Sequence, residues 1–132
     1  MGPLSKAQIK FIQSLHHKKF RLKYNKFIVE GLKITRELAE DKRRLAEDVY
    51  ISNPDYAEYL TGVPKEHLHL ITPPQMHSLS QMTTPPGVLA ICRIPDDRVM
   101  PEDFSGLKGF YLDAIRDPGN LGTILRIADW FG

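Results

Sequence analysis

The residues best suited to chemistry lie at the end of the chain, in LDAIRDPGNLGTILRIADWFG (residues 112–132). Pro118, Gly119 and Asn120 are typical of a turn into a helix, because Pro fixes φ, Gly permits positive φ and Asn can cap a helix. From Thr123 onward, apolar residues recur at helical spacing. The N–H groups of such a helix start can hold an anion, but the glycines lack dinucleotide-fingerprint spacing and no P-loop lysine follows. By residue type alone, an ordinary strand–loop–helix connection stays open as the alternative.

Arg126 is the cation of this segment that could act on a substrate. A guanidinium remains protonated at neutral pH, so it is a poor general base. It is well suited to gripping a phosphate with two hydrogen bonds and to stabilising a developing alkoxide electrostatically. The alternative is a surface ion pair with Asp129, three residues further along the helix.

A second candidate site is the cationic start of the chain. Residues 1–33 carry a net charge of +7, residues 34–106 carry −5 and residues 107–132 are neutral, although the whole chain is only +2. A polyanion would therefore meet this end first. The cations expected to contact RNA phosphates are Lys18, Lys19, Arg21, Lys23 and Lys26. Phe20 and Tyr24 could stack on unpaired bases, or they could be core aromatics beside a solvated basic face.

Other reactive residues give weaker signals. His16 and His17 have no further ligands at suitable spacing, so no metal site is expected. Cys92 is the only cysteine and lies in an apolar run, so we expect a buried, inert thiol. A lone cysteine and the absence of an apolar signal segment favour a reducing, cytoplasmic setting. No apolar run approaches the roughly 20 residues of a membrane helix, so no membrane partner is expected.

The elements that must position these residues alternate in type. Ser5 is a plausible N-cap for an amphipathic helix over about Lys6–Ser14, and the basic segment after it is expected to be loop-like or weakly helical. Strands are predicted at 26–31, 46–52, 67–72 and 87–95, with helices between them at 32–42, 53–62 and 73–82. This alternation predicts a small α/β sandwich with a largely parallel sheet.

A change of composition marks a domain boundary. Residues 96–106 are rich in proline and acidic side chains and poor in aliphatic ones. We therefore expect one domain at 1–95, a linker at 96–106, and a further strand at 107–115 that begins a second domain over 107–132.

The closing string as a whole resembles the first conserved motif of the SpoU (TrmH-like) family of RNA 2′-O-ribose methyltransferases, in the SPOUT superfamily. The matching residues are Asp113, Asp117, Pro118, Asn120, Gly122, Arg126, Ala128, Phe131 and Gly132. Ala114 and Ile127 stand where glycine and threonine are frequent. Neither change removes a catalytic group, although loss of a hydroxyl at position 127 could alter local hydrogen bonding. FIVEGLKITREL and TTPPGVLAICRIP resemble the small substrate-binding domain at the front of many such enzymes, which looks like RNA-binding ribosomal proteins.

This resemblance implies a fold, a reaction and site residues. Residues 1–95 would form an α/β/α RNA substrate-binding domain, and 107–132 the first strand and helix of a SPOUT α/β-knot domain. Family members transfer a methyl group from S-adenosyl-L-methionine to a ribose 2′-OH, usually as homodimers. Arg126 would lie at the reacting ribose, and Asn120 would orient the loop. The two later cofactor motifs do not occur in these 132 residues, so we expect no cofactor-binding residues here and no activity from this chain alone.

Three functions remain open from the sequence. The first is the N-terminal RNA-recognition portion of a ribose methyltransferase, acting on ribosomal rather than transfer RNA because of the appended domain. The second is a stand-alone RNA-binding module like a ribosomal protein. The third is a protein-interaction domain without a role in RNA binding.

Overall fold

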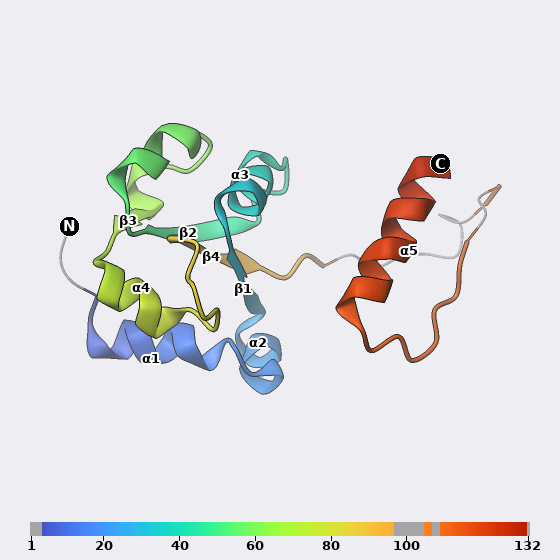
Figure 1. The fold of residues 1–132 in the computed structure, drawn as a ribbon, viewed down its shortest axis with the longest axis horizontal. Helices are drawn as coiled ribbons and strands as arrows, with labels where there is room; N and C mark the ends of the chain where they lie inside the picture. The colour runs from blue at the N-terminus through green and yellow to red at the C-terminus, as the bar shows by residue number, and fades with distance from the viewer. Residues whose placement is uncertain (1–3, 97–104, 107–108, 132) are drawn as a thin grey trace. The chain divides into compact units, whose positions relative to one another are not determined.

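The computed structural model describes residues 4–96, 105–106 and 109–131. The chain divides into two compact units, Met1–Asp96 and Asp97–Gly132 (Figure 1). Most of the predicted linker, residues 97–104, lies outside the described residues.

A four-stranded sheet in the order β1-β4-β2-β3 forms the centre of the first unit. The strands are β1 (Lys26–Glu30), β2 (Ala46–Ile51), β3 (Leu68–Leu70) and β4 (Val88–Arg93). Strand β4 is antiparallel to both β1 and β2, and only β2 and β3 are parallel.

The prediction of a largely parallel sheet was therefore wrong. The chain after β3 does not cross back to the opposite end of the sheet before it enters β4. Instead, the N–H of Ser52, just after β2, donates to the carbonyl of Gly87, just before β4, at 3.0 Å. Because β4 begins where β2 ends, it must run in the opposite direction.

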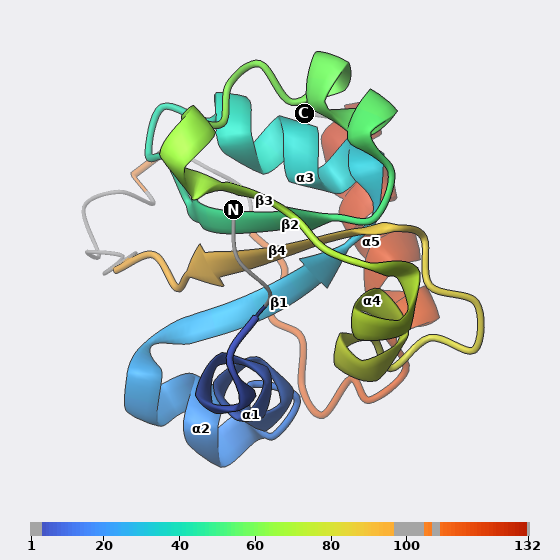
Figure 2. The same ribbon diagram turned by 90° about the vertical axis from the view of Figure 1, so that its left-hand side faces the viewer.

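Helices cover both faces of this sheet, which confirms the layered α/β prediction (Figure 2). Helices α1 (Lys6–Ser14) and α4 (Pro73–Leu79) lie on one face, and α3 (Leu32–Glu40) lies on the other. Helix α2 (Lys18–Tyr24) connects α1 to β1 and is a defined helix rather than a loop.

Local capping explains where several helices begin. The Ser5 hydroxyl and the Gln8 side chain form a reciprocal capping box at the start of α1, as the sequence predicted for Ser5. The helix expected at 53–62 is instead a 3₁₀ helix, η1 (Pro54–Tyr59). Its last turn closes with Leu60 N–H on the carbonyl of Ala57, three residues back, so no α-helical ladder forms. A second 3₁₀ turn, η2 (Lys65–His67), precedes β3.

The core packs on both faces of β4. Leu89 and Ile91 join the cluster under α1 and α4, and Val88, Ala90 and Cys92 join the cluster under α3 and η1. All five side chains are at most 2% exposed. Burial, together with the nearby charge of Glu47, raises the pKa of the Cys92 thiol to about 12. The prediction of a buried, inert thiol is confirmed.

The second unit contains helix α5 (Pro118–Phe131). The strand expected at 107–115 does not form in its described part, residues 109–115. A strand needs a neighbour to pair its backbone groups, and none of the described strands pairs with this segment. No helix among the described residues is long and apolar enough to span a membrane.

One buried hydroxyl yields a stability prediction. Thr35 on α3 is fully buried, and its Oγ1 has no hydrogen-bond partner among the described residues. Valine keeps the side-chain shape without the desolvated hydroxyl, so Thr35→Val should raise the free energy of unfolding by about 1 kcal/mol. Urea unfolding measures this, with Thr35→Ala as a control that should destabilise by leaving a cavity. A less stable Thr35→Val variant would contradict the assignment.

Candidate nucleic-acid interface

Helix α2 presents three of the predicted RNA-contacting cations to solvent. Lys18, Lys19 and Lys23 are all exposed. Lys19 and Lys23 are four residues apart and so share one helix face. The Lys23 ammonium lies 5.3 Å from the centroid of the Tyr24 ring. These lysines are available to a polyanion.

The other two predicted cations are engaged within the protein. Arg21 Nη1 donates to the carbonyls of Leu15 at 3.1 Å and His16 at 2.7 Å. These carbonyls follow the end of α1, so Arg21 fixes the turn between α1 and α2. Lys26 forms an ion pair with Glu47 across the sheet. The five cations thus divide into an exposed set on α2 and two that also stabilise the fold.

The aromatic residues of α2 form a surface stack. Phe20 and Tyr24 have ring centroids 6.3 Å apart and an interplanar angle of 13°. Tyr24 also meets Phe11 of α1 edge-on at 5.1 Å. Tyr24 is 38% exposed, so this pair joins α1 to α2 without entering the core. Phe20 is only partly buried and Tyr24 is exposed, so the interpretation of these rings as core aromatics was wrong.

The adjacent histidines do not act as a pair. His16 Nε2 forms a hydrogen bond with the carbonyl of Leu79 at 2.7 Å and so ties α1 to α4. His17 instead precedes α2 as its N-cap residue. Among the described residues, no cluster of His, Cys, Asp and Glu side chains is arranged to hold a metal ion.

A polar cluster that sequence reasoning missed lies on β2, η2 and β3. Asp48 Oδ1 is hydrogen-bonded to His69 Nε2 at 2.9 Å and to His67 Nδ1 at 3.3 Å, and Tyr50 stacks on His69. Burial opposes ionisation of Asp48, but the hydrogen bonds from His69 and His67 outweigh it and hold the pKa of the carboxyl below its ordinary value. The only hint of this cluster in the local sequence is that His67 and His69 lie two positions apart. Their meeting with Asp48 depends on the β2–β3 register.

In the second unit, the helix of the closing motif begins earlier than predicted. Helix α5 starts at Pro118 rather than Thr123. Asp117 Oδ2 accepts a hydrogen bond from Asn120 N–H at 2.8 Å. Asp117 thus caps the helix, and Asn120 lies in its first turn. An aspartate followed by proline is a favourable helix start, which explains why the expected cap at Asn120 was wrong.

The backbone turn of this segment also differs from expectation. Positive φ occurs at Ala114, with φ of 52°, and not at Gly119, which is helical. Ala114 stands where glycine is frequent in the family pattern, and glycine adopts this conformation without strain. Arg126 is exposed on α5, and within the described residues 109–131 it forms no ion pair with Asp129. The alternative interpretation of Arg126, as a partner of Asp129 in a surface ion pair, is therefore not supported by the structure.

Comparison with known proteins shows the family of the first unit. Residues 6–90, which cover most of this unit, match the family model of the MRM3-like substrate binding domain. The chain belongs to this family. The matched range runs from α1 into β4, so it contains α2 with its exposed lysines.

Relatives of this MRM3-like chain are methyltransferases by name. It is 27% identical to the 23S rRNA (guanosine(2553)-2′-O)-methyltransferase RlmP of Bacillus subtilis, over 95% of this chain and 48% of that protein. It is 29% identical to the mitochondrial rRNA methyltransferase 3 of Xenopus laevis, over 96% of this chain and 32% of that protein. The chain thus spans between a third and a half of the length of these relatives.

Solved structures agree with this assignment. A TrmH-family protein from Porphyromonas gingivalis superposes with a TM-score of 0.76 at 29% identity, covering 99% of this chain and 50% of that one. An rRNA methyltransferase from Sinorhizobium meliloti gives a TM-score of 0.67 at 25% identity, covering 98% and 50%. The SpoU methyltransferase AviRb from Streptomyces viridochromogenes, solved with AdoMet, shares the fold at 21% identity, with a TM-score of 0.68 and coverage of 97% and 51%. The SpoU resemblance is confirmed.

Substitutions at Arg21 and Lys19 test whether Arg21 stabilises the fold while Lys19 does not. Arg21→Gln removes both hydrogen bonds to the carbonyls that follow α1 and should lower the free energy of unfolding by about 1 kcal/mol. Lys19→Gln removes the same charge from an exposed site and should change it by less than about 0.5 kcal/mol. Urea unfolding of both variants measures the difference. Equal effects would contradict a structural role for Arg21.

Proposed function

We propose that this chain is the RNA-recognition portion of an rRNA 2′-O-ribose methyltransferase that uses S-adenosyl-L-methionine. The observation that carries this proposal is the match of residues 6–90 to an MRM3-like substrate binding domain. The motif on α5, at the other end of the chain, supports a catalytic domain over a stand-alone binding module.

We propose that the exposed face of α2 is the primary contact with RNA. Lys18, Lys19 and Lys23 would neutralise phosphates, and half-exposed Tyr24 would stack on an unpaired base. Arg21 and Lys26 lie beside them and add positive potential while they hold α1 and β2 in place. RNA would bind here through its backbone first, because the exposed groups are point charges on flexible stems.

Arg126 and Asn120 are the proposed catalytic residues of the full-length protein. Arg126 would hold the phosphate beside the target ribose and stabilise the oxyanion that forms as the 2′-OH loses its proton. Asn120 would position the loop, and the hydrogen bond from its N–H to Asp117 supports this role by fixing the first turn of α5. Because a guanidinium does not accept a proton at neutral pH, Arg126 acts by electrostatics and not as a base.

The methyl group would come from S-adenosyl-L-methionine. The cavity of about 580 Å³ against α5 is lined by apolar residues, including Phe110, Leu112, Ile124 and Phe131. Its side chains offer no hydrogen-bond donor or acceptor for the carboxylate, ammonium and ribose hydroxyls of the cofactor. We assign no cofactor contact to this chain.

The apolar side of α5 supports a larger catalytic domain. Leu125, Trp130 and Phe131 are 58%, 83% and 83% exposed in the second unit. Side chains of this size are seldom left in water together, so further protein would cover them. We propose that the full-length enzyme works as a homodimer, as the resemblance to the family implies. We also propose that it works in the cytoplasm, a reducing setting that suits a chain with a single, buried cysteine.

RNA binding by α2 has a direct test. The triple variant Lys18→Gln, Lys19→Gln, Lys23→Gln should weaken binding to a structured ribosomal RNA fragment and reduce the slope of log affinity against log salt by about 2 to 3. Fluorescence anisotropy across a salt series measures both. The control triple Lys33→Gln, Arg36→Gln, Lys65→Gln removes the same charge elsewhere. Equal losses in the two triples would sink the assignment to α2, and no RNA binding by the wild type would sink the proposed function.

Arg126 is tested in the full-length enzyme. Arg126→Ala should lower the rate of methyl transfer by about 10²- to 10³-fold, because oxyanion stabilisation is lost. Cofactor affinity, measured by calorimetry, should not change. Asp129→Asn, a charge change one helical turn away, serves as the control. Wild-type turnover in the Arg126→Ala enzyme would remove the assignment.

A further inference from the structure

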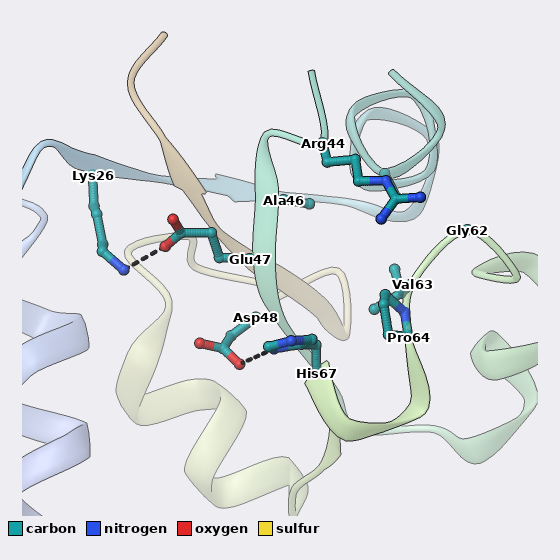
Figure 3. Close-up of a pocket in the computed structure, with 10 residues that line it drawn as sticks. Lys26, Arg44, Ala46, Glu47, Asp48, Gly62, Val63, Pro64 and His67 are labelled. Carbon is teal, nitrogen blue, oxygen red and sulfur yellow. Dashed lines mark hydrogen bonds and ion pairs between the residues drawn. The ribbon is translucent and has the colours of Figure 1, made fainter. Parts of the chain in front are cut away.

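An open cavity of about 540 Å³ lies at the end of the sheet where β1 and β2 begin (Figure 3). Arg44, from the α3–β2 loop, forms one side, and Val63 and Pro64, from the segment before β3, form the facing side. Lys26, Glu47 and Asp48 lie at the sheet side of the opening. This sheet-end cavity therefore combines apolar walls with charges of both signs.

Two departures from regular backbone structure and one close backbone approach meet at the sheet-end cavity. Arg44 adopts φ of 47°, which is uncommon for a residue other than glycine. The register of β2 against β4 shifts between Ala46 and Asp48, so that Glu47 is an extra residue. A Cβ at Gly62 would lie 3.3 Å from the carbonyl oxygen of Ala39, so a larger residue here would require a shift of a few tenths of an ångström against α3. Strain and bulges of this kind concentrate at functional sites.

The loop that carries Arg44 is held in this shape. Arg44 N–H donates to the carbonyl of Asp41 at 2.8 Å, and Asp41 Oδ1 accepts from Arg43 N–H at 2.8 Å. In the part of the chain that the structure describes, no side chain pairs with the Arg44 guanidinium, which is exposed. A rigid loop thus presents an unneutralised arginine at the edge of the cavity.

Both carboxylates keep one oxygen for a ligand. Glu47 uses Oε2 for Lys26, and Asp48 uses Oδ1 for both His67 and His69. Glu47 Oε1 and Asp48 Oδ2 form no bond with any described residue. An ionised carboxylate can accept several hydrogen bonds, so each side chain can serve its protein partner and a ligand together.

We propose that the sheet-end cavity holds one unpaired RNA nucleotide, with a phosphate on Arg44 and the base edge turned to Glu47 and Asp48. This inference rests on the proposed function, since it takes RNA as the substrate. Carboxylate oxygens accept hydrogen bonds from the exocyclic amino groups of cytosine, adenine and guanine. Uracil has no amino group, and its one Watson–Crick donor, N3–H, lies between two carbonyl oxygens that a carboxylate repels. The cavity should therefore discriminate against uracil.

Single-stranded RNA of uniform sequence tests this selectivity. The full chain should bind a decamer of cytidine about fivefold or more tightly than a decamer of uridine, as measured by fluorescence anisotropy. Glu47→Gln should bring the two affinities within about twofold, because an amide can donate to uracil as well as accept. Arg44→Gln should weaken both decamers alike by about fivefold. Arg36→Gln, on the exposed side of α3, is the charge-matched control and should change neither.

Amide NMR of the wild-type chain gives a second measurement that needs no substitution. The cytidine decamer should shift the amide signals of Arg44, Glu47 and Val63. Shifts confined to α2, or equal affinities for the two decamers, would overturn the nucleotide site and leave the proposed function standing, because RNA would still bind. A wild-type chain that binds neither decamer nor the ribosomal RNA fragment would overturn both.

Discussion

Strand β4 is hydrogen-bonded along both edges and buried on both faces, and the rest of the first unit depends on this position. Its backbone pairs with β1 and β2, so neither of those strands could stay in register without it. Its side chains alternate between the two core clusters, from Val88 to Cys92. Because β4 is the last strand of this sheet in chain order, the sheet is complete only when residues separated by about 60 positions have met. The fold is therefore closed by a long-range contact, which carries a larger loop-closure entropy than a local one.

The arrangement around β4 also decides which polar residues gather. Lys26, Glu47 and Arg93 lie at one end of three neighbouring strands, beyond the reach of the apolar clusters. Arg93 N–H donates to the carbonyl of Leu45 at 2.8 Å, and its guanidinium donates to the carbonyl of Arg43 at 3.1 Å. The end of the central strand thus anchors the α3–β2 loop. Charged residues and the anchored α3–β2 loop lie at this end because the apolar clusters do not extend to it.

The two units differ in how far they bury their own apolar side chains. In the first unit, apolar side chains of α1 and α4 are buried against the sheet, those of α3 are partly buried against it, and exposed cations gather on α2. In the second unit, α5 buries none of its residues, although nearly every other position is apolar. A helix of this kind is stabilised chiefly by packing, so its motif can be positioned for chemistry only when its apolar side is covered.

Local features were predictable from the sequence because they depend on interactions between residues that are close along the chain. The Ser5 cap, the layered α/β class and the burial of Cys92 depend on neighbouring residues and on periodicity, and the SpoU-type string from Asp113 to Phe131 is specific as a string. Tertiary structure alone decided the antiparallel direction of β4 and the meeting of Asp48 with His69. Each joins groups whose distance along the chain says nothing of their distance in space. Strand order and register are set by the sum of core contacts, and no single residue encodes that sum.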